Sequence, residues 1–72
     1  MELTFDANEL FQKIEICEEL FIRSEQEDAV SPVHRGAYKH ILTIKNRLEI
    51  YKPTTVSLDE YDMEALERLW NL

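Results

Sequence analysis

The sequence has one glycine, two prolines and one cysteine among its 72 residues. So little glycine excludes phosphate-cradling loops as motifs, and together with the scarce proline it disfavours a disordered or β-rich chain. No apolar run approaches the about 18 residues of a membrane span, and the N-terminus lacks the basic and apolar regions of a signal peptide. Cys17 has no second cysteine to pair with, which agrees with a reducing compartment. We expect a cytoplasmic protein, in the host cytoplasm if a phage encodes it.

Hydrophobic residues make up 44% of the chain, a share that suits a folded helical domain. A chain of this length buries only about 60% of its unfolded surface, so its core is small and its stability marginal. We predict a single domain over residues 1–72 that holds no cofactor. Binding to a second copy or to another protein would increase the buried area and the stability.

Residues 32–51 are predicted to form a basic amphipathic helix around which the chain is organised. Ser31 is a favourable N-cap, Pro32 suits the first helical position, and Pro53 ends the helix. At about 100° per residue, its apolar side chains fall in an arc of roughly 80°, the stripe that a helix turns toward a core. The stripe consists of Val33, Ala37, Ile41, Ile44, Leu48 and Tyr51.

Two acidic helices, over about 7–25 and 58–71, are predicted on either side of the basic one. Asp6 with Glu9, and Ser57 with Glu60, have the spacing of capping boxes at their starts. Residues 1–5 are expected to be an extended lead-in, and residues 53–55 a linker. The fold class is therefore all-α, a small antiparallel three-helix bundle that is complete alone or completed by homodimerisation; the alternative is a helical hairpin whose third helix packs across a dimer. The inward stripes of the two acidic helices are Ala7, Leu10, Phe11, Ile14, Cys17, Phe21 and Ile22, and Leu58, Tyr61, Ala65, Leu69 and Leu72.

Both acidic helices carry more apolar side chains than one helix interface uses. Ile16 and Leu20 lie about 120° to 160° from Ile14 around the first helix, and a second stripe on the third helix is similarly rotated from its inward stripe. Tryptophan and methionine are enriched at the centres of protein interfaces, although such a stripe can also close a bundle from a second side. We predict a partner interface formed by Ile16, Leu20, Met63, Leu66 and Trp70.

The formal net charge is −7, divided as −7 in residues 1–30, +4 in residues 31–52 and −4 in residues 53–72. A chain without a dominant basic surface is not expected to bind nucleic acid directly or to bind an anionic membrane. The expected partner is a larger protein with a basic or apolar groove, and a homodimer or higher oligomer is also expected.

The charges of the basic helix have two interpretations. In the first, they pair with glutamates of the neighbouring helices and select the packing partners, as flanking charges do in coiled coils. In the second, they form a patch for an anion such as a nucleotide or phosphate. That patch would consist of His34, Arg35, Tyr38, Lys39 and Lys45.

Catalytic and metal sites are not predicted. Cys17 with His34 or His40 is the only candidate nucleophile and base pair, and Cys17 lies on the most apolar face of its helix, as a buried hydrophobe does. The two histidines lie about 120° apart on their helix, so they do not form a metal-binding pair. The acidic residues at 59–64 lack the spacing and turn glycine of an EF-hand loop. We expect a protein that is not an enzyme.

The leading hypothesis is a non-enzymatic acidic module that binds a larger protein and inhibits or recruits it, of the inhibitor, antitoxin, immunity or phage-encoded host-takeover type. One alternative is a DNA mimic that presents helix carboxylates to a nucleic-acid-binding protein. Another is an oligomer that sequesters a small anionic ligand through the basic helix. The acidic surface of the mimic would consist of Glu15, Glu18, Glu19, Glu25, Glu27 and Asp28.

Overall fold

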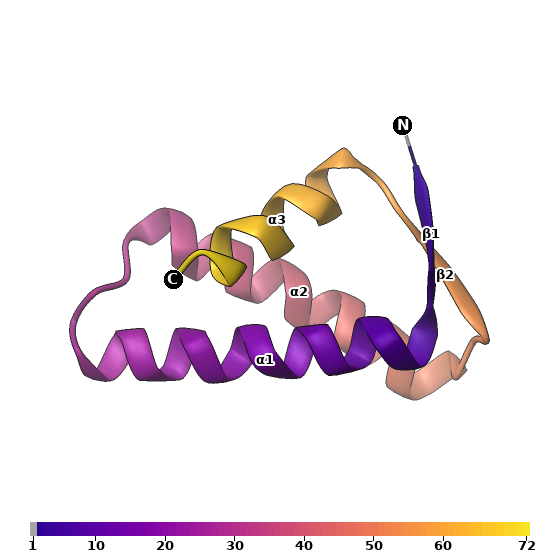
Figure 1. Ribbon diagram of the computed structural model, residues 1–72, viewed down its shortest axis with the longest axis horizontal. Coiled ribbons are helices and arrows are strands. Elements are labelled where there is room, and N and C mark those ends of the chain that lie inside the picture. The colour runs from indigo at the N-terminus through magenta and orange to yellow at the C-terminus, as the bar shows by residue number, and fades with distance from the viewer. Residues whose placement is uncertain (1) are drawn as a thin grey trace.

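The structure, a computed structural model that describes residues 2–72, consists of three helices and two short strands (Figure 1). Their order is β1 (Leu3–Asp6), α1 (Ala7–Gln26), α2 (Pro32–Tyr51), β2 (Thr55–Leu58) and α3 (Glu60–Trp70). The helices form a small bundle, which confirms the predicted fold class. The antiparallel pair of strands at one end of the bundle is an addition that the sequence analysis did not predict.

The starts of α1 and α2 lie at the residues that their caps predicted. The Asp6 side chain accepts hydrogen bonds from the backbone N–H groups of Asn8 and Glu9. Ser31 caps α2 and forms a reciprocal capping box with His34, and Pro32 occupies the first helical position. These contacts satisfy backbone donors that have no partner inside a helix, so each start is fixed locally.

The predicted start of α3 is wrong. Its N-cap is Asp59, whose carboxylate accepts from the Asp62 N–H while the Asp62 carboxylate accepts from the Asp59 N–H. The predicted box of Ser57 and Glu60 does not form, because residues 55–58 are extended and pair with β1. The helix therefore begins two residues later than expected and ends at Trp70.

Residues other than glycine adopt the left-handed backbone conformation at the ends of the first two helices. Asp28, with φ of 57°, follows α1, and Lys52, with φ of 46°, caps α2. Aspartate visits this region more readily than most residues, since its short polar side chain bonds locally. The turn after α1 is therefore defined, with the Ala29 N–H donating to the Ser24 carbonyl.

The strands pair antiparallel, with Leu3 opposite Leu58 and Phe5 opposite Val56. Because side chains alternate along a strand, these four share one face of the small sheet. Leu58 is buried, and Phe5 and Val56 pack partly buried against the core. The two strands therefore form a small sheet at one end of the helices. The sequence analysis had assigned these residues to an extended lead-in, a linker and the start of the third helix. Met1 lies outside the described residues.

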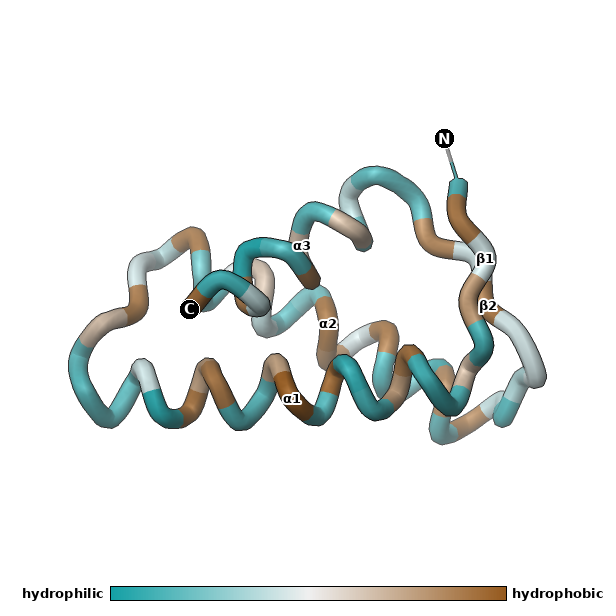
Figure 2. The backbone as a smooth tube through the Cα atoms, in the orientation of Figure 1, coloured by the Kyte–Doolittle hydropathy of each residue, from teal (hydrophilic) through white to brown (hydrophobic). Residues whose placement is uncertain are grey.

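The core lies where the three helices meet, and apolar segments recur along α1 at each turn (Figure 2). Four predicted core residues are exposed instead. Val33 and Tyr51 are on the first and last turns of α2, whose 20 residues are too many for α3, with 11 residues and a length of about 16 Å, to cover along their whole length. Ile22 and Tyr61 lie at the edges of the buried arcs. The buried residues are Ala7, Leu10, Ile14, Cys17, Phe21, Ala37, Ile41, Ile44, Leu48, Leu58, Ala65 and Leu69.

Candidate functional site

An apolar groove of about 470 Å³ lies between α1 and α3 and is the candidate site. The ribbons of the two helices diverge toward the strands (Figure 1). β1 contributes Phe5 to the lining. The other lining residues are Leu10, Lys13, Cys17, Met63, Leu66, Glu67, Trp70 and Asn71.

Buried apolar side chains form the floor of the groove, and its α3 wall is partly open. Leu10 and Cys17 on α1 are buried, Met63 and Leu66 are half-buried, and Trp70 remains 50% exposed. The structure thus brings Met63, Leu66 and Trp70 together, as their helical spacing predicted. A half-exposed tryptophan beside other apolar side chains is the composition found at the centres of protein interfaces.

Ile16 and Leu20 flank the groove rather than line it. Ile16 is three residues after Lys13, and Leu20 is three residues after Cys17. Residues three apart are neighbours on a helix surface, so Ile16 and Leu20 each lie beside a lining residue of the groove. Ile16 is 43% exposed and Leu20 is half-buried. They extend the apolar surface along α1 beyond the groove.

The Cys17 thiol forms part of the groove floor and is not arranged as a nucleophile. Its Sγ lies 3.9 Å from the Leu66 carbonyl oxygen, to which the thiol donates, and burial raises the pKa of the thiol. A raised pKa lowers the thiolate fraction at neutral pH.

The rims of the groove carry opposite charges, which the sequence analysis did not single out. Lys13 stands on the α1 rim, with Nζ 5.7 Å from the centroid of the Phe5 ring, and Glu67 stands on the α3 rim. Neither has an ion-pair partner among residues 2–72. The sequence contained an indication of the position of Lys13. It precedes Ile16 and Cys17 by about one helical turn and therefore lies on the same side of α1.

The predicted acidic surface is partly neutralised by α2. Lys45 Nζ lies 2.6 Å from a Glu18 carboxylate oxygen, and an Arg35 nitrogen lies 2.8 Å from one of Glu25. The hydrogen bond to Glu18 raises the pKa of Lys45, although burial alone would lower it. The four remaining predicted acidic residues, Glu15, Glu19, Glu27 and Asp28, are exposed.

The predicted anion patch is also largely occupied by contacts within the chain. His34 closes the α2 capping box, and Arg35 pairs with Glu25. The Tyr38 ring stacks on that of Phe21 with centroids 4.1 Å apart, and Lys45 is held by Glu18. Lys39 is exposed. These contacts favour the interpretation in which the basic helix selects its neighbours by charge.

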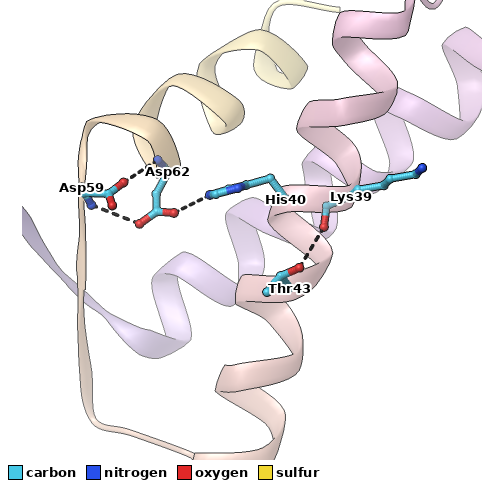
Figure 3. Close-up of polar contacts among 5 residues, drawn as sticks. All are labelled: Lys39, His40, Thr43, Asp59 and Asp62. Carbon is cyan, nitrogen blue, oxygen red and sulfur yellow. Dashed lines mark hydrogen bonds and ion pairs between the residues drawn. The ribbon is translucent and has the colours of Figure 1, made fainter.

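One further polar pair joins α2 to α3. His40 Nε2 lies 2.5 Å from Asp62 Oδ1, and the other Asp62 oxygen accepts from the Asp59 N–H (Figure 3). Burial alone would raise the pKa of Asp62, but the hydrogen bonds from His40 and Asp59 outweigh it, so the pKa is lowered. Beside this network, Thr43 donates to the carbonyl of Lys39 within α2. Within residues 2–72, no group of three or more histidine, cysteine or acidic side chains is placed to hold a metal ion.

Comparison of the chain with protein-family models, curated proteins and solved structures found no match. No helix between residues 2 and 72 combines the length and apolarity that crossing a bilayer requires. The groove and the charged faces are therefore the features from which a function is inferred.

Proposed function

We propose that this chain is a non-enzymatic protein-binding module that inhibits or recruits a larger protein through the α1–α3 groove. The observation that carries the proposal is the half-exposed Trp70, which stands beside Met63 and Leu66 at an apolar groove of about 470 Å³. An inserted apolar side chain would remove this surface from water, and such burial drives most protein association.

The charge distribution supports a larger protein as the ligand. The chain carries a net charge of −7, and four carboxylates of the predicted acidic surface are exposed and form no ion pair within residues 2–72. A partner with basic residues around its contact surface would be steered toward such a protein and would bind it faster at low salt. The DNA-mimic alternative is less favoured, since two of its six carboxylates, Glu18 and Glu25, are held by cations of α2.

The proposal is tested by combining Trp70→Ala with Leu66→Ala. The double variant should lose capture of the partner from the native cytosol while its far-UV circular dichroism stays unchanged. Tyr61→Ala is the matched control, because Tyr61 is a 75% exposed aromatic residue on the same helix but does not line the groove. Loss of helicity in the double variant would assign both residues to the core instead, and equal capture by all variants would contradict the proposal.

Trp70 also gives a direct signal, because it is the only tryptophan in the chain. Once a partner is identified, its addition should shift the fluorescence emission of Trp70 to shorter wavelength as the indole leaves water. An unchanged spectrum on a saturated complex would place the binding surface elsewhere.

A further inference from the structure

The two rims of the groove are oppositely charged, and we propose that in the free protein a second copy of this chain occupies the groove. In this homodimer, α1 of each copy packs against α3 of the other, and Lys13 faces Glu67 of the partner subunit. The inference goes beyond the proposed function, because it concerns the protein before a larger partner binds. Dimerisation and capture of that partner would use one surface, so the two would compete.

Lys13 and Glu67 stand within about two helical turns of each other along the groove. The Cys17 thiol contacts the Leu66 carbonyl, which fixes the level of α1 against α3. Lys13 lies four residues, about 6 Å, before Cys17, and Glu67 lies one residue, about 1.5 Å, after Leu66 on a helix that runs in the same direction (Figure 1), so the levels of Lys13 and Glu67 differ by roughly 8 Å. The lysine and glutamate side chains together span such a difference.

Symmetry then decides which walls meet. A two-fold axis that runs along the groove exchanges its walls and preserves the level, so Lys13 of each copy faces Glu67 of the partner subunit. An axis across the groove would set α1 against α1 and bring like charges together. Opposite charges at both contacts favour the first arrangement, since like charges brought together in an interface are unfavourable.

Both charged groups are available for this contact. The Lys13 ammonium rests over the Phe5 ring, and neither Lys13 nor Glu67 forms an ion pair within residues 2–72. The net charge of −7 opposes association at long range, but physiological salt screens charges separated by more than about 8 Å. A contact pair in a partly buried groove is screened much less.

A dimer of standard size needs more surface than the groove alone provides. A standard interface covers about 800 Å² per partner, roughly a sixth of the 5125 Å² accessible surface of this chain. The interface must therefore extend beyond the groove, and Ile16 and Leu20 continue the apolar surface along the α1 wall that the partner's α3 would cover. A small core gains stability from this burial.

Sedimentation at physiological salt tests the proposal with two charge reversals. Lys13→Glu and Glu67→Lys each place like charges at both contacts, so each should weaken the wild-type dimer by at least about tenfold. In the Lys13→Glu variant both rim positions are acidic, and in the Glu67→Lys variant both are basic. An equimolar mixture of the two variants therefore forms heterodimers in which an acidic position faces a basic one at each contact. Both contacts are then favourable, so the mixture should recover a dimer of wild-type affinity.

Lys39→Glu and Glu19→Lys are the matched controls, because they make the same charge changes at exposed positions outside the groove. Both should dimerise as the wild type does, and far-UV circular dichroism should show that all variants keep their helices. The proposal is overturned if the wild type stays monomeric at about 100 μM, if Lys13→Glu leaves the dimer intact, or if the mixture does not associate. A monomer whose groove binds an apolar dye would also overturn it and indicate a small-ligand site.

The two proposals fail in different ways. A monomer that still captures a larger protein through Trp70 would refute the dimer and keep the proposed function. A dimer that shows the charge-reversal rescue, but whose Trp70 and Leu66 variants capture as the wild type does, would refute the proposed function alone.

Discussion

His40 on α2 and Asp62 on α3 are in hydrogen-bonding contact across the bundle, with 2.5 Å between Nε2 and Oδ1. The same carboxylate accepts the Asp59 N–H and thereby closes the α3 cap. One side chain thus couples the start of α3 to its packing against α2.

This coupling predicts an acid-sensitive contribution to stability. The folded protein holds the pKa of Asp62 below its unfolded value, so the contribution is present above the unfolded pKa and is lost as pH falls through the folded pKa. Asp62→Asn should lower the free energy of unfolding at pH 7 by about 1–3 kcal/mol. Urea titrations should show this difference shrinking below about pH 5. Glu19→Gln, at an exposed position, is the control, and a difference independent of pH would contradict the prediction.

The position of the α3 cap predicts unequal effects at two neighbouring sites. Asp59→Ala should destabilise the protein by about 1 kcal/mol, because the Asp62 N–H loses its acceptor. Ser57→Ala should cost less than about 0.5 kcal/mol, since Ser57 is an exposed strand residue. Chemical unfolding of both variants checks this. A larger effect at Ser57 would indicate that the helix begins there.

Burial on α3 predicts a contrast between two large side chains of the same helix. Leu69 is fully buried, and Leu69→Ala should lower the free energy of unfolding by about 2–5 kcal/mol through lost contacts and a cavity. Tyr61→Ala should change it by less than about 0.5 kcal/mol. The midpoints of thermal or urea unfolding measure both. Equal losses would mean that Tyr61 packs in the core.

The environment of Cys17 predicts a slow reaction with thiol reagents. The side chain is 1% exposed and its burial raises the thiol pKa, so both access and thiolate fraction are low. Labelling by a disulfide reagent should be slow in buffer and should accelerate as urea populates open states. A short unstructured peptide carrying one cysteine gives the reference rate. Labelling of the native chain at that rate would show that the groove floor is open.

α2 was predicted correctly at both ends because its signals are local: Ser31 and Pro32 start it and Pro53 follows it. The start of α3 was ambiguous, since Ser57 with Glu60 and Asp59 with Asp62 have the same spacing. The pairing of residues 55–58 with β1 decides between the two positions, and β1 lies far away in the sequence. No local rule contains that information.

The candidate site was also predicted only in part. Helical periodicity identified Met63, Leu66 and Trp70 as a surplus stripe, and the structure gathers them at one groove. Phe5 and the charged rims were missed, because the groove results from the divergence of two helices and from a strand at its end. Crossing geometry depends on packing across the whole chain, which a single segment does not encode.

The pairing of β1 with β2 has a consequence for how the chain acquires its shape. Joining residues 3–6 to residues 55–58 closes a loop of roughly fifty residues, and such long closures are late and slow relative to helix formation. During synthesis, α1 and α2 can associate as a hairpin while the N-terminal strand waits unpaired. The nascent polypeptide must therefore carry an open strand edge until residues 55–58 have left the ribosome.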